Sequence, residues 1–348
     1  MNELNGKTYF LHTLGCKVNA YETFAIGQEM KERGASETQS EEKADIIVLN
    51  TCSVTARADQ KSRQHISSFK RKNPFCALLV MGCYSQTHAE ECMRLGADIV
   101  LGSSKRKEGV DYLIRFLSDG EKVIDVKPSV RSESYEELGS TAYTDNARAY
   151  LKIQDGCDNF CSYCFIPRLR GNSRSRAPRE VIEEASSLVK KGFKEIIIIG
   201  IHIGAYGKDF EGQEFRLPDL LEAMIAKVPG IRRIRISSIE ESEIDERFLL
   251  LLKRFPNIVD HLHIPLQSGS TNVLKAMRRH YDTEAFLNKL RAIREVRPDI
   301  AITTDIIAGF PTETEKDHQD TLEFCRKASF AEIHVFPFPP VPVPWPRR

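Results

Sequence analysis

The chain has 348 residues, with 50 lysines and arginines against 49 aspartates and glutamates, and its formal net charge is +1 at pH 7. This length leaves room for two domains that each bury a hydrophobic core. The near balance of charge excludes nucleic-acid binding through bulk positive charge, so any such contact must come from local basic patches. The sequence has no apolar run of membrane-spanning length and no apparent signal peptide, and its nine cysteines indicate reduced thiols and metal ligation in the cytoplasm.

Residues 5–126 alternate between apolar strands and amphipathic helices, which predicts a doubly wound parallel α/β domain. Three cysteines stand just beyond the ends of expected strands: Cys16, Cys52 and Cys83. Because the carboxyl ends of parallel strands share one edge, where ligands bind, we expect these thiols to converge.

Three converging thiolates favour an iron–sulfur cubane with one iron left open. Gly15 and Gly82 precede two of these cysteines and allow the backbone angles that a cluster loop needs. The alternative is that the three cysteines pack as small hydrophobic residues. We expect that packing role for the remaining cysteines outside the array described below, which are Cys76, Cys92 and Cys325.

Residues 127–147 are polar, with little periodicity, and form the expected linker between domains. Beyond them, six strands alternate with helices, which predicts a partial six-stranded (β/α) barrel over residues 148–338. The expected strands cover residues 148–153, 195–200, 233–237, 261–265, 300–306 and 331–336. A six-stranded barrel leaves an open side through which a macromolecular substrate could reach the centre.

The loop after the first barrel strand carries the array Cys157-Asp-Asn-Phe-Cys161-Ser-Tyr-Cys164. Three soft thiolates at this spacing suit a [4Fe–4S] cluster that keeps one iron free for a substrate or cofactor. A structural zinc site fits less well, because zinc takes four ligands and the next histidine or cysteine, His202, is far along the chain. A disulfide with one cysteine left over is the remaining alternative.

The array matches that of the radical S-adenosylmethionine (SAM) enzymes. Gly15-Cys-Lys-Val-Asn-Ala-Tyr-Glu-Thr23, Asn50-Thr-Cys-Ser-Val-Thr55 and Gly82-Cys-Tyr-Ser-Gln86 resemble the amino-terminal signatures of the methylthiotransferases. This resemblance spans residues 5 to about 338. It implies two [4Fe–4S] clusters: one on the array, which cleaves SAM reductively, and an auxiliary one in the first domain, which takes part in sulfur transfer. The implied ligands are Cys157, Cys161 and Cys164 for the first cluster, and Cys16, Cys52 and Cys83 for the second.

Loops at the carboxyl ends of the barrel strands supply the expected SAM contacts. These residues are Gly200, Gly204, Ser238, Glu240, Gln267 and Ser268. Each could instead serve only loop formation or helix capping. Many radical SAM enzymes carry a Gly-Gly-Glu motif after the second barrel strand, and this sequence does not. His261 and His263 alternate on the fourth strand and so share a face, where we expect satisfied interior histidines; no catalytic residue is assigned.

Arginines cluster directly after the cysteine array. We expect four of them to contact RNA, since guanidinium groups suit phosphate recognition: Arg168, Arg170, Arg174 and Arg176. The alternatives are a solvated loop, or pairing with the nearby carboxylates Glu180, Glu183 and Glu184.

The resemblance implies methylthiolation of a tRNA base, with a second SAM as methyl donor. The Gly-Cys-Lys-Val-Asn motif is most similar to the branch that acts at C2 of N6-threonylcarbamoyladenosine, at position 37 of tRNA. Sister branches act on isopentenyladenosine or on a ribosomal protein. The implied partners are the tRNA anticodon stem-loop and an electron donor such as flavodoxin or ferredoxin, for a cytoplasmic, monomeric enzyme without membrane contact.

Residues 339–348 form a proline-rich irregular tail, which excludes a helix or a central strand. Members of the family usually continue into more of the barrel domain and then a TRAM domain that grips RNA. This end therefore resembles a truncated or altered C-terminus, for which we expect weak RNA affinity. Two further hypotheses remain open: an inactive iron–sulfur, RNA-binding remnant, and a radical SAM enzyme with an unrelated substrate.

Overall fold

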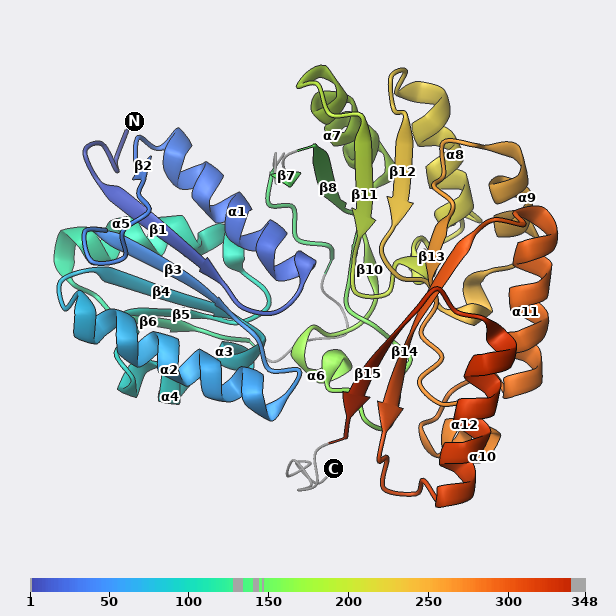
Figure 1. Ribbon diagram of the computed structural model, residues 1–348. Helices are drawn as coiled ribbons and strands as arrows, with labels where there is room; N and C mark the ends of the chain where they lie inside the picture. Colours follow the sequence, from blue (N-terminus) through green and yellow to red (C-terminus); the bar gives the residue numbers. More distant parts are fainter. Residues whose placement is uncertain (1, 128–133, 140–143, 146, 339–348) are drawn as a thin grey trace. The chain divides into compact units, whose positions relative to one another are not determined.

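The structure is a computed structural model that describes residues 2–127, 134–139, 144–145 and 147–338 (Figure 1). The chain forms two compact units. Unit 1 comprises Met1–Thr144 and Phe165–Asn172, and unit 2 comprises Asp145–Cys164 and Ser173–Arg348. The chain therefore leaves unit 2 directly after the cysteine array, joins unit 1 for eight residues and then returns. The expected proline-rich tail, and parts of the expected linker, lie outside the described residues.

Unit 1 is built on a six-stranded parallel sheet in the order β2-β1-β3-β4-β5-β6. Its strands are β1 (Thr8–Thr13), β2 (Ser36–Glu37), β3 (Ile46–Thr51), β4 (Ala77–Gly82), β5 (Ile99–Leu101) and β6 (Val123–Asp125). Every residue of the central strands β3 and β4 is buried, which matches their continuous apolar sequences and the burial of parallel sheets on both faces.

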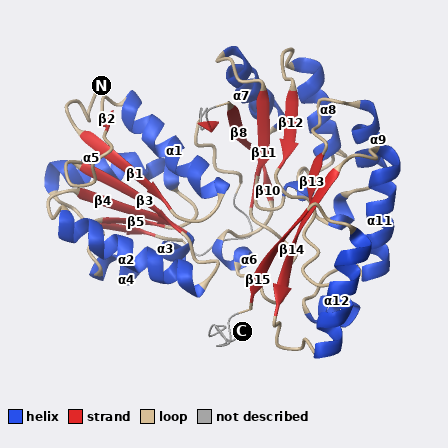
Figure 2. Cartoon of the chain, viewed as in Figure 1, coloured by secondary structure: helices blue, strands red, loops and turns tan. Residues whose placement is uncertain are grey.

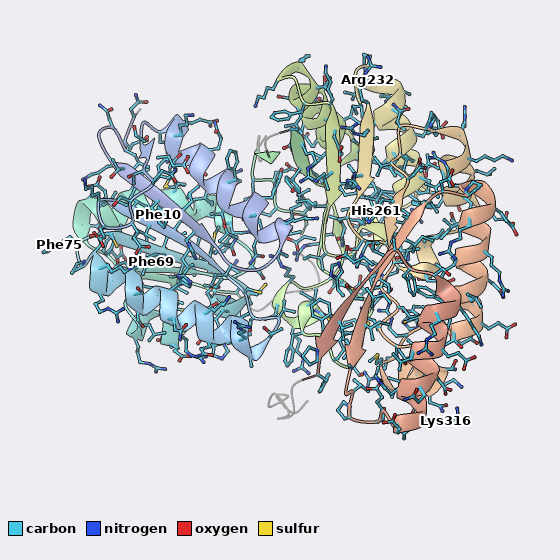
Figure 3. The ribbon with its side chains drawn as sticks, in the orientation of Figure 1. Phe10, Phe69, Phe75, Arg232, His261 and Lys316 are labelled. Atoms are coloured by element: carbon cyan, nitrogen blue, oxygen red, sulfur yellow. The ribbon has the colours of Figure 1, made fainter. Side chains whose placement is uncertain are left out.

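Helices cover both faces of this sheet (Figure 2). They are α1 (Lys17–Glu32), α2 (Ala56–Lys72), α3 (Cys83–Thr87), α4 (Ala89–Arg94), η1 (Arg106–Glu108) and α5 (Gly109–Asp119). One core joins α1 and α5 to the sheet, and a second core joins α2 and α4 to its other face. Phe10 and Phe69 meet in the second core with ring centroids 6.1 Å apart (Figure 3), and Cys76 and Cys92 are buried there, in the expected packing role. Unit 1 is thus the doubly wound α/β domain predicted.

Unit 2 is an open barrel of parallel strands. Its six principal strands are β8 (Arg148–Lys152), β11 (Glu195–Ile199), β12 (Arg233–Ile236), β13 (His261–His263), β14 (Ala301–Ala308) and β15 (Glu332–Pro337). They form two sheets, β12-β11-β8-β7 with the short β7 (Thr144–Asp145), and β13-β14-β15. An isolated parallel β-bridge between Ile234 on β12 and Ile258, just before β13, connects the two sheets. Among the described residues no strand pairing joins β15 to β7 or β8, so the barrel is open, as expected for six strands.

Helices pack on the outer side of these strands (Figure 1). They are α7 (Pro178–Lys190), α8 (Leu217–Lys227), α9 (Glu246–Arg254), α10 (Thr271–Ala276), α11 (Thr283–Val296) and α12 (Glu315–Ala328). Side chains of Asp245, Asp282 and Thr314 accept backbone N–H groups at the starts of α9, α11 and α12, which fixes where these helices begin. None of the helices in the described part of the chain is both long and apolar enough to cross a lipid bilayer.

Candidate functional site

Unit 1 brings its three expected cluster cysteines to the carboxyl edge of its sheet. Cys16 precedes α1, Cys52 directly follows β3, and Cys83 is the first residue of α3, directly after β4. Burial raises the pKa of the Cys52 thiol and raises that of Cys83 to about 11, and the neighbouring cysteines add to both shifts. Cys16 acts electrostatically on both Cys52 and Cys83, and Cys52 acts on Cys83, which agrees with their shared place at one edge of the sheet.

Two glycines let the loops of this group approach each other. Gly15 has φ +97° and Gly82 has φ +107°, a backbone region that side chains with a Cβ rarely adopt. A Cβ on Gly15 would lie 2.9 Å from the sulfur of Cys52, and a Cβ on Gly82 would lie 2.3 Å from Oδ1 of Asn50. The backbone freedom expected at these two glycines is therefore used in the fold.

Asn19, three residues after Cys16, ties the loops together. Its Nδ2 donates to the carbonyl oxygens of Leu14 and Thr51, at 2.9 and 3.0 Å. Its Oδ1 lies 3.6 Å from the sulfur of Cys16, and its own carbonyl accepts from Nδ2 of Asn50 at 2.9 Å. The sequence signal was present, since Asn19 lies within the Gly-Cys-Lys-Val-Asn motif, but spacing alone did not reveal its role.

A buried arginine lies beside the cysteines of unit 1. Arg170 is 1% exposed, and its guanidinium donates to Oε1 of Glu22 at 2.9 Å and to Oδ1 of Asn19 at 2.6 Å. It also hydrogen-bonds the thiol of Cys83, and its positive charge lowers the pKa of both Cys83 and Cys52 against the larger effect of burial. Arg170 is therefore placed to favour the thiolate form that a metal cluster requires.

This placement argues against the RNA contact expected of Arg170, and burial argues against two more of the four arginines. Arg176 is 3% exposed and pairs with Glu184, one of the carboxylates considered as an alternative partner. Arg174 is 7% exposed. Only Arg168 is exposed, so it alone keeps the surface position that a phosphate contact requires. The sequence showed that four arginines lie close together, but it did not show that three of them are buried in the fold.

In unit 2, Cys157, Cys161 and Cys164 occupy the loop after β9 (Gln154–Asp155). Gly156 precedes the first cysteine with φ +72°, and the amide of Cys164 donates to the carbonyl of Cys161 at 3.0 Å. The loop thus repeats the arrangement of unit 1, in which a glycine with positive φ leads directly into a cysteine.

Gln154 anchors this loop to the one after β11. Its Nε2 donates to the carbonyls of Asp155 and Gly156, both at 2.8 Å. Its Oε1 accepts the backbone N–H groups of Ile201 and His202, at 3.1 and 2.7 Å. Because Gln154 is fully buried, one side chain fixes the start of the cysteine loop and the backbone at His202 together.

His202 lies beside the first cysteine of the array despite its distance in sequence. Its Nδ1 is 3.6 Å from the sulfur of Cys157, and its Nε2 is 2.8 Å from Oε2 of Glu243. Lys208 contacts the other oxygen of Glu243 at 2.9 Å. Burial alone would lower the pKa of His202, but hydrogen bonds to Cys157 and Glu243 raise it to about 10. His202 is therefore a direct hydrogen-bonding partner of the first sulfur of the array.

Arg279 makes the corresponding contact to the second cysteine, and sequence reasoning missed it. Its Nη1 donates to the sulfur of Cys161 at 3.4 Å, its Nη2 pairs with Glu240, and its Nε donates to the hydroxyl of Tyr281 at 3.0 Å. Burial would lower the pKa of Arg279, but Glu240 and the neighbouring groups raise it. No motif around Arg279 indicated that it would reach the array, which lies more than a hundred residues earlier in the chain.

The six expected SAM contacts have different surroundings. A Cβ on Gly200 would lie 3.0 Å from the carbonyl of Gln154, and one on Gly204 would lie 2.5 Å from Oε2 of Glu243, so both glycines make room for neighbouring groups. Ser268 is fully buried and within 3.4 Å of the Thr321 hydroxyl, which argues against a contact with SAM.

The other three candidates keep positions consistent with ligand binding. Ser238 and Gln267 are half-buried, and Gln267 has φ +70°. Glu240 is held by Arg279 beside the cysteine loop.

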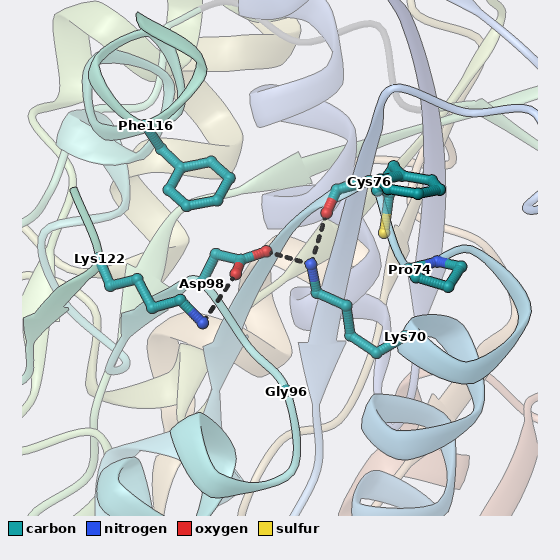
Figure 4. A pocket seen from close by; sticks show the side chains of 8 residues that line it. Lys70, Pro74, Cys76, Gly96, Asp98, Phe116 and Lys122 are labelled. Atoms are coloured by element: carbon teal, nitrogen blue, oxygen red, sulfur yellow. Dashed lines mark hydrogen bonds and ion pairs between the residues drawn. The ribbon is translucent and has the colours of Figure 1, made fainter. Parts of the chain in front are cut away.

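A separate hollow of 570 Å³ in unit 1 is shown in Figure 4. It lies at the amino ends of β4 and β5, and Cys16, Cys52 and Cys83 lie at the carboxyl edge of the sheet. Its residues include Phe75 and Cys76, just before β4, and Asp98, just before β5. Lys70 and Lys122 pair with Asp98 at 2.5 and 3.2 Å, which satisfies the charge of that buried carboxylate. The hollow is thus distinct from the cysteine group.

Comparison with known proteins gives consistent results. Residues 151–325 match the radical SAM superfamily, and residues 8–102 match uncharacterized protein family UPF0004. The chain is 46% identical to the threonylcarbamoyladenosine tRNA methylthiotransferase MtaB of Bacillus subtilis, over 95% of this chain and 73% of that protein. It is 38% identical to MtaB of Thermotoga maritima, over 97% and 76%. It is 35% identical to the tRNA-2-methylthio-N(6)-dimethylallyladenosine synthase of Bacillus pumilus, over 97% and 67%.

Among solved structures, the radical SAM methyltransferase TsrM of Kitasatospora setae aligns with a TM-score of 0.68 at 14% identity, over 95% of this chain and 73% of that chain. The cobalamin-dependent radical SAM enzyme OxsB aligns with a TM-score of 0.64 at 16% identity, over 91% and 52%. At these identities the likeness supports the fold alone. The identities to curated relatives, which extend across both units, are decisive: the chain is an enzyme of the radical SAM methylthiotransferase family.

Proposed function

We propose that this enzyme inserts sulfur and a methyl group at C2 of N6-threonylcarbamoyladenosine at position 37 of tRNA. The observation that carries this proposal is the 46% identity to a threonylcarbamoyladenosine tRNA methylthiotransferase over nearly the whole chain. Identity to the dimethylallyladenosine synthases is lower, at 35%. The cytoplasm, where tRNA is modified, is the compartment that this substrate implies.

Family membership implies iron–sulfur clusters and SAM as cofactors. We propose that each group of three cysteines holds one [4Fe–4S] cluster with an iron left open. The donor sets fit, because thiolates are the ligands such clusters take and each group stands beside a cationic side chain. The proposed ligands are Cys157, Cys161 and Cys164 in unit 2, and Cys16, Cys52 and Cys83 in unit 1. When bound, the clusters would supply the electron for SAM cleavage and the site of sulfur transfer, with flavodoxin or ferredoxin as the electron source.

The protein's own groups would prepare these sites. Arg170 favours the thiolates of unit 1 by its charge and by its hydrogen bond to Cys83. In unit 2, His202 and Arg279 contact two sulfurs of the array, those of Cys157 and Cys161, at 3.6 and 3.4 Å. All three cations are buried and held by carboxylates, so the geometry exists before any cluster is loaded.

For SAM we retain Glu240, Ser238 and Gln267 as the proposed polar contacts. For tRNA we retain Arg168, whose side chain is exposed. We propose that the three buried arginines, Arg170, Arg174 and Arg176, stabilise the fold. Arg170 would also favour the thiolate form of the unit 1 cysteines.

A cluster count tests the two-site proposal. After anaerobic reconstitution, we expect about eight iron and eight sulfide per chain. The triple variant Cys157→Ala/Cys161→Ala/Cys164→Ala and the triple variant Cys16→Ala/Cys52→Ala/Cys83→Ala should each retain about half. An unchanged iron content in either variant would remove that trio from the ligand set.

The substrate is tested by mass spectrometry of nucleosides from tRNA incubated with enzyme, SAM, sulfide and a reductant. We expect the methylthio derivative of threonylcarbamoyladenosine. The methylthio derivative of isopentenyladenosine would assign the chain to the sister branch. Reductive cleavage of SAM without either product would favour an unrelated substrate, and no SAM cleavage at full iron content would favour an inactive remnant.

A further inference from the structure

Three side chains that belong to neither cysteine group converge on adjacent strands of unit 2. They are His263 on β13, Asp305 on β14 and His334 on β15. One ligand atom from each lies within 4.8 Å of the others. Strand register explains the convergence, because Asp305 and His334 are paired residues on neighbouring parallel strands.

All three residues lie on the face of the sheet that points away from the helices. Their strand neighbours Leu262 and Ile306 belong to the core that packs against α11 and α12. Since side chains alternate along a strand, the residues adjacent to them face the inside of the open barrel. The group thus lies on the inner face, where barrel enzymes place their functional side chains.

Hydrogen bonds fix the orientation of His263. Its Nδ1 is 2.9 Å from the hydroxyl of Thr303, which in turn is 3.3 Å from Nε2 of His261. Its Nε2 is 3.1 Å from Oδ2 of Asp305. In metal-binding histidines the ring nitrogen that does not bind the metal is usually hydrogen-bonded. In His263 that nitrogen would be Nδ1, held by Thr303, and Nε2 would be the ligand beside Asp305.

We propose that His263, Asp305 and His334 form a binding site for one divalent transition-metal cation such as Zn²⁺ or Mn²⁺. Two imidazoles and one carboxylate are a ligand set that such cations accept. Two ligands about 2.0–2.1 Å from a tetrahedral metal lie roughly 3.3 Å apart, close to the observed separation of the His263 and Asp305 atoms. His334 is exposed, so its ring can turn toward the same point.

Three protein ligands leave at least one coordination position open. That position would face the barrel interior and would accept an oxygen ligand, such as water or a carboxylate. Without a cation, His263 and Asp305 could simply pair with each other. That pairing does not explain the second imidazole, His334, whose ring centroid lies 6.0 Å from that of His263. The proposal does not depend on the tRNA substrate.

Zinc retention tests the site. The protein is first reconstituted with iron and sulfide, so that its cluster cysteines are occupied, and is then stripped with a chelator, exposed to Zn²⁺ and desalted anaerobically. We expect about one zinc per chain by elemental analysis, and near none in His334→Ala or in Asp305→Ala. His318→Ala serves as the matched control, because His318 is a half-buried histidine on α12 outside the group, and it should retain the full equivalent.

Manganese provides an independent readout, because free Mn²⁺ gives an EPR signal that is lost on binding. The wild type and His318→Ala should remove about one equivalent of this signal, and His334→Ala should not. Iron content and circular dichroism establish that each variant is folded, and His334 lies at an exposed position where truncation should disturb little. Equal zinc and manganese retention by the wild type and His334→Ala, or none by the wild type, would overturn the proposal.

Discussion

The guanidinium of Arg170 lies 2.9 Å from the carboxylate of Glu22, although 148 residues separate them in sequence. Both side chains are buried within unit 1. Arg170 belongs to the short segment Phe165–Asn172 that follows the cysteine array and packs with unit 1. The residues that follow one proposed cluster loop therefore help to build the other.

Replacing Arg170 should destabilise unit 1. In Arg170→Met, Glu22 loses one cation and keeps Arg106, which contacts it at 2.7 Å. We expect a loss of about 3 kcal/mol in the free energy of unfolding, at the low end for a broken buried ion pair. Denaturant unfolding of the cluster-free protein measures this loss. The exposed Arg168→Met should change it by less than about 0.5 kcal/mol, and an equally small effect at Arg170 would contradict the assigned role.

A methyl group at Gly82 should disrupt the unit 1 site selectively. The backbone there has φ +107° and ψ −155°, a region essentially restricted to glycine, and a Cβ would also lie 2.5 Å from the carbonyl of Thr51. Gly82→Ala should therefore lower the unfolding free energy by about 3 kcal/mol and remove roughly half of the reconstituted iron.

Gly120→Ala is the matched control for this change. Gly120 also has a positive φ, +75°, but nothing lies within 4 Å of its added Cβ. It should lose only about 1–2 kcal/mol and keep all of its iron. If Gly82→Ala retained full iron, close approach at Gly82 would not be needed for the site.

Much of the fold was predictable because its signals are local. The buried strands β3 and β4 are continuous apolar runs, and the cysteines that follow β1, β3 and β4 meet because parallel strands end at one edge. The two-residue β2 and three-residue β6 are too short to carry a periodicity of their own, so the sequence alone does not indicate them.

The cations around the sulfurs were harder to predict. The positions of Arg279 and His202 beside the array depend on which barrel loops meet in space, and one sequence without its fold does not specify this. Arg170 and Arg176 were expected at an RNA surface, because a run of arginines looks the same whether it is solvated or paired. Both arginines are paired and buried because the fold places Glu22 beside Arg170 and Glu184 beside Arg176.

The stabilisation that Asp317 gives to the start of α12 should be lost at acid pH. Hydrogen bonds from Ser270 at 2.6 Å and from Thr314 lower the pKa of Asp317 to about 2, below its usual 3.8. A carboxylate with a depressed folded-state pKa stabilises the fold above the unfolded value and loses that effect as the pH falls through the folded one. The stability difference between wild type and Asp317→Asn should therefore be constant above about pH 5 and shrink as the pH falls from 3.8 toward 2. Thermal unfolding across this range measures it, and a pH-independent difference would show that the cap does not titrate as described.

Arg279 should support SAM cleavage more than cluster retention. Its planar fork contacts the sulfur of Cys161, Glu240 and the Tyr281 hydroxyl at once, which the point charge of a lysine cannot reproduce. In Arg279→Lys we expect near-normal iron content but at least about a tenfold slower formation of 5′-deoxyadenosine, equivalent to roughly 1.4 kcal/mol. The neighbouring exposed Arg278→Lys should leave this rate unchanged. Equal loss of iron and of rate in Arg279→Lys would instead assign Arg279 to holding the loop, because the rate would then follow the amount of cluster present.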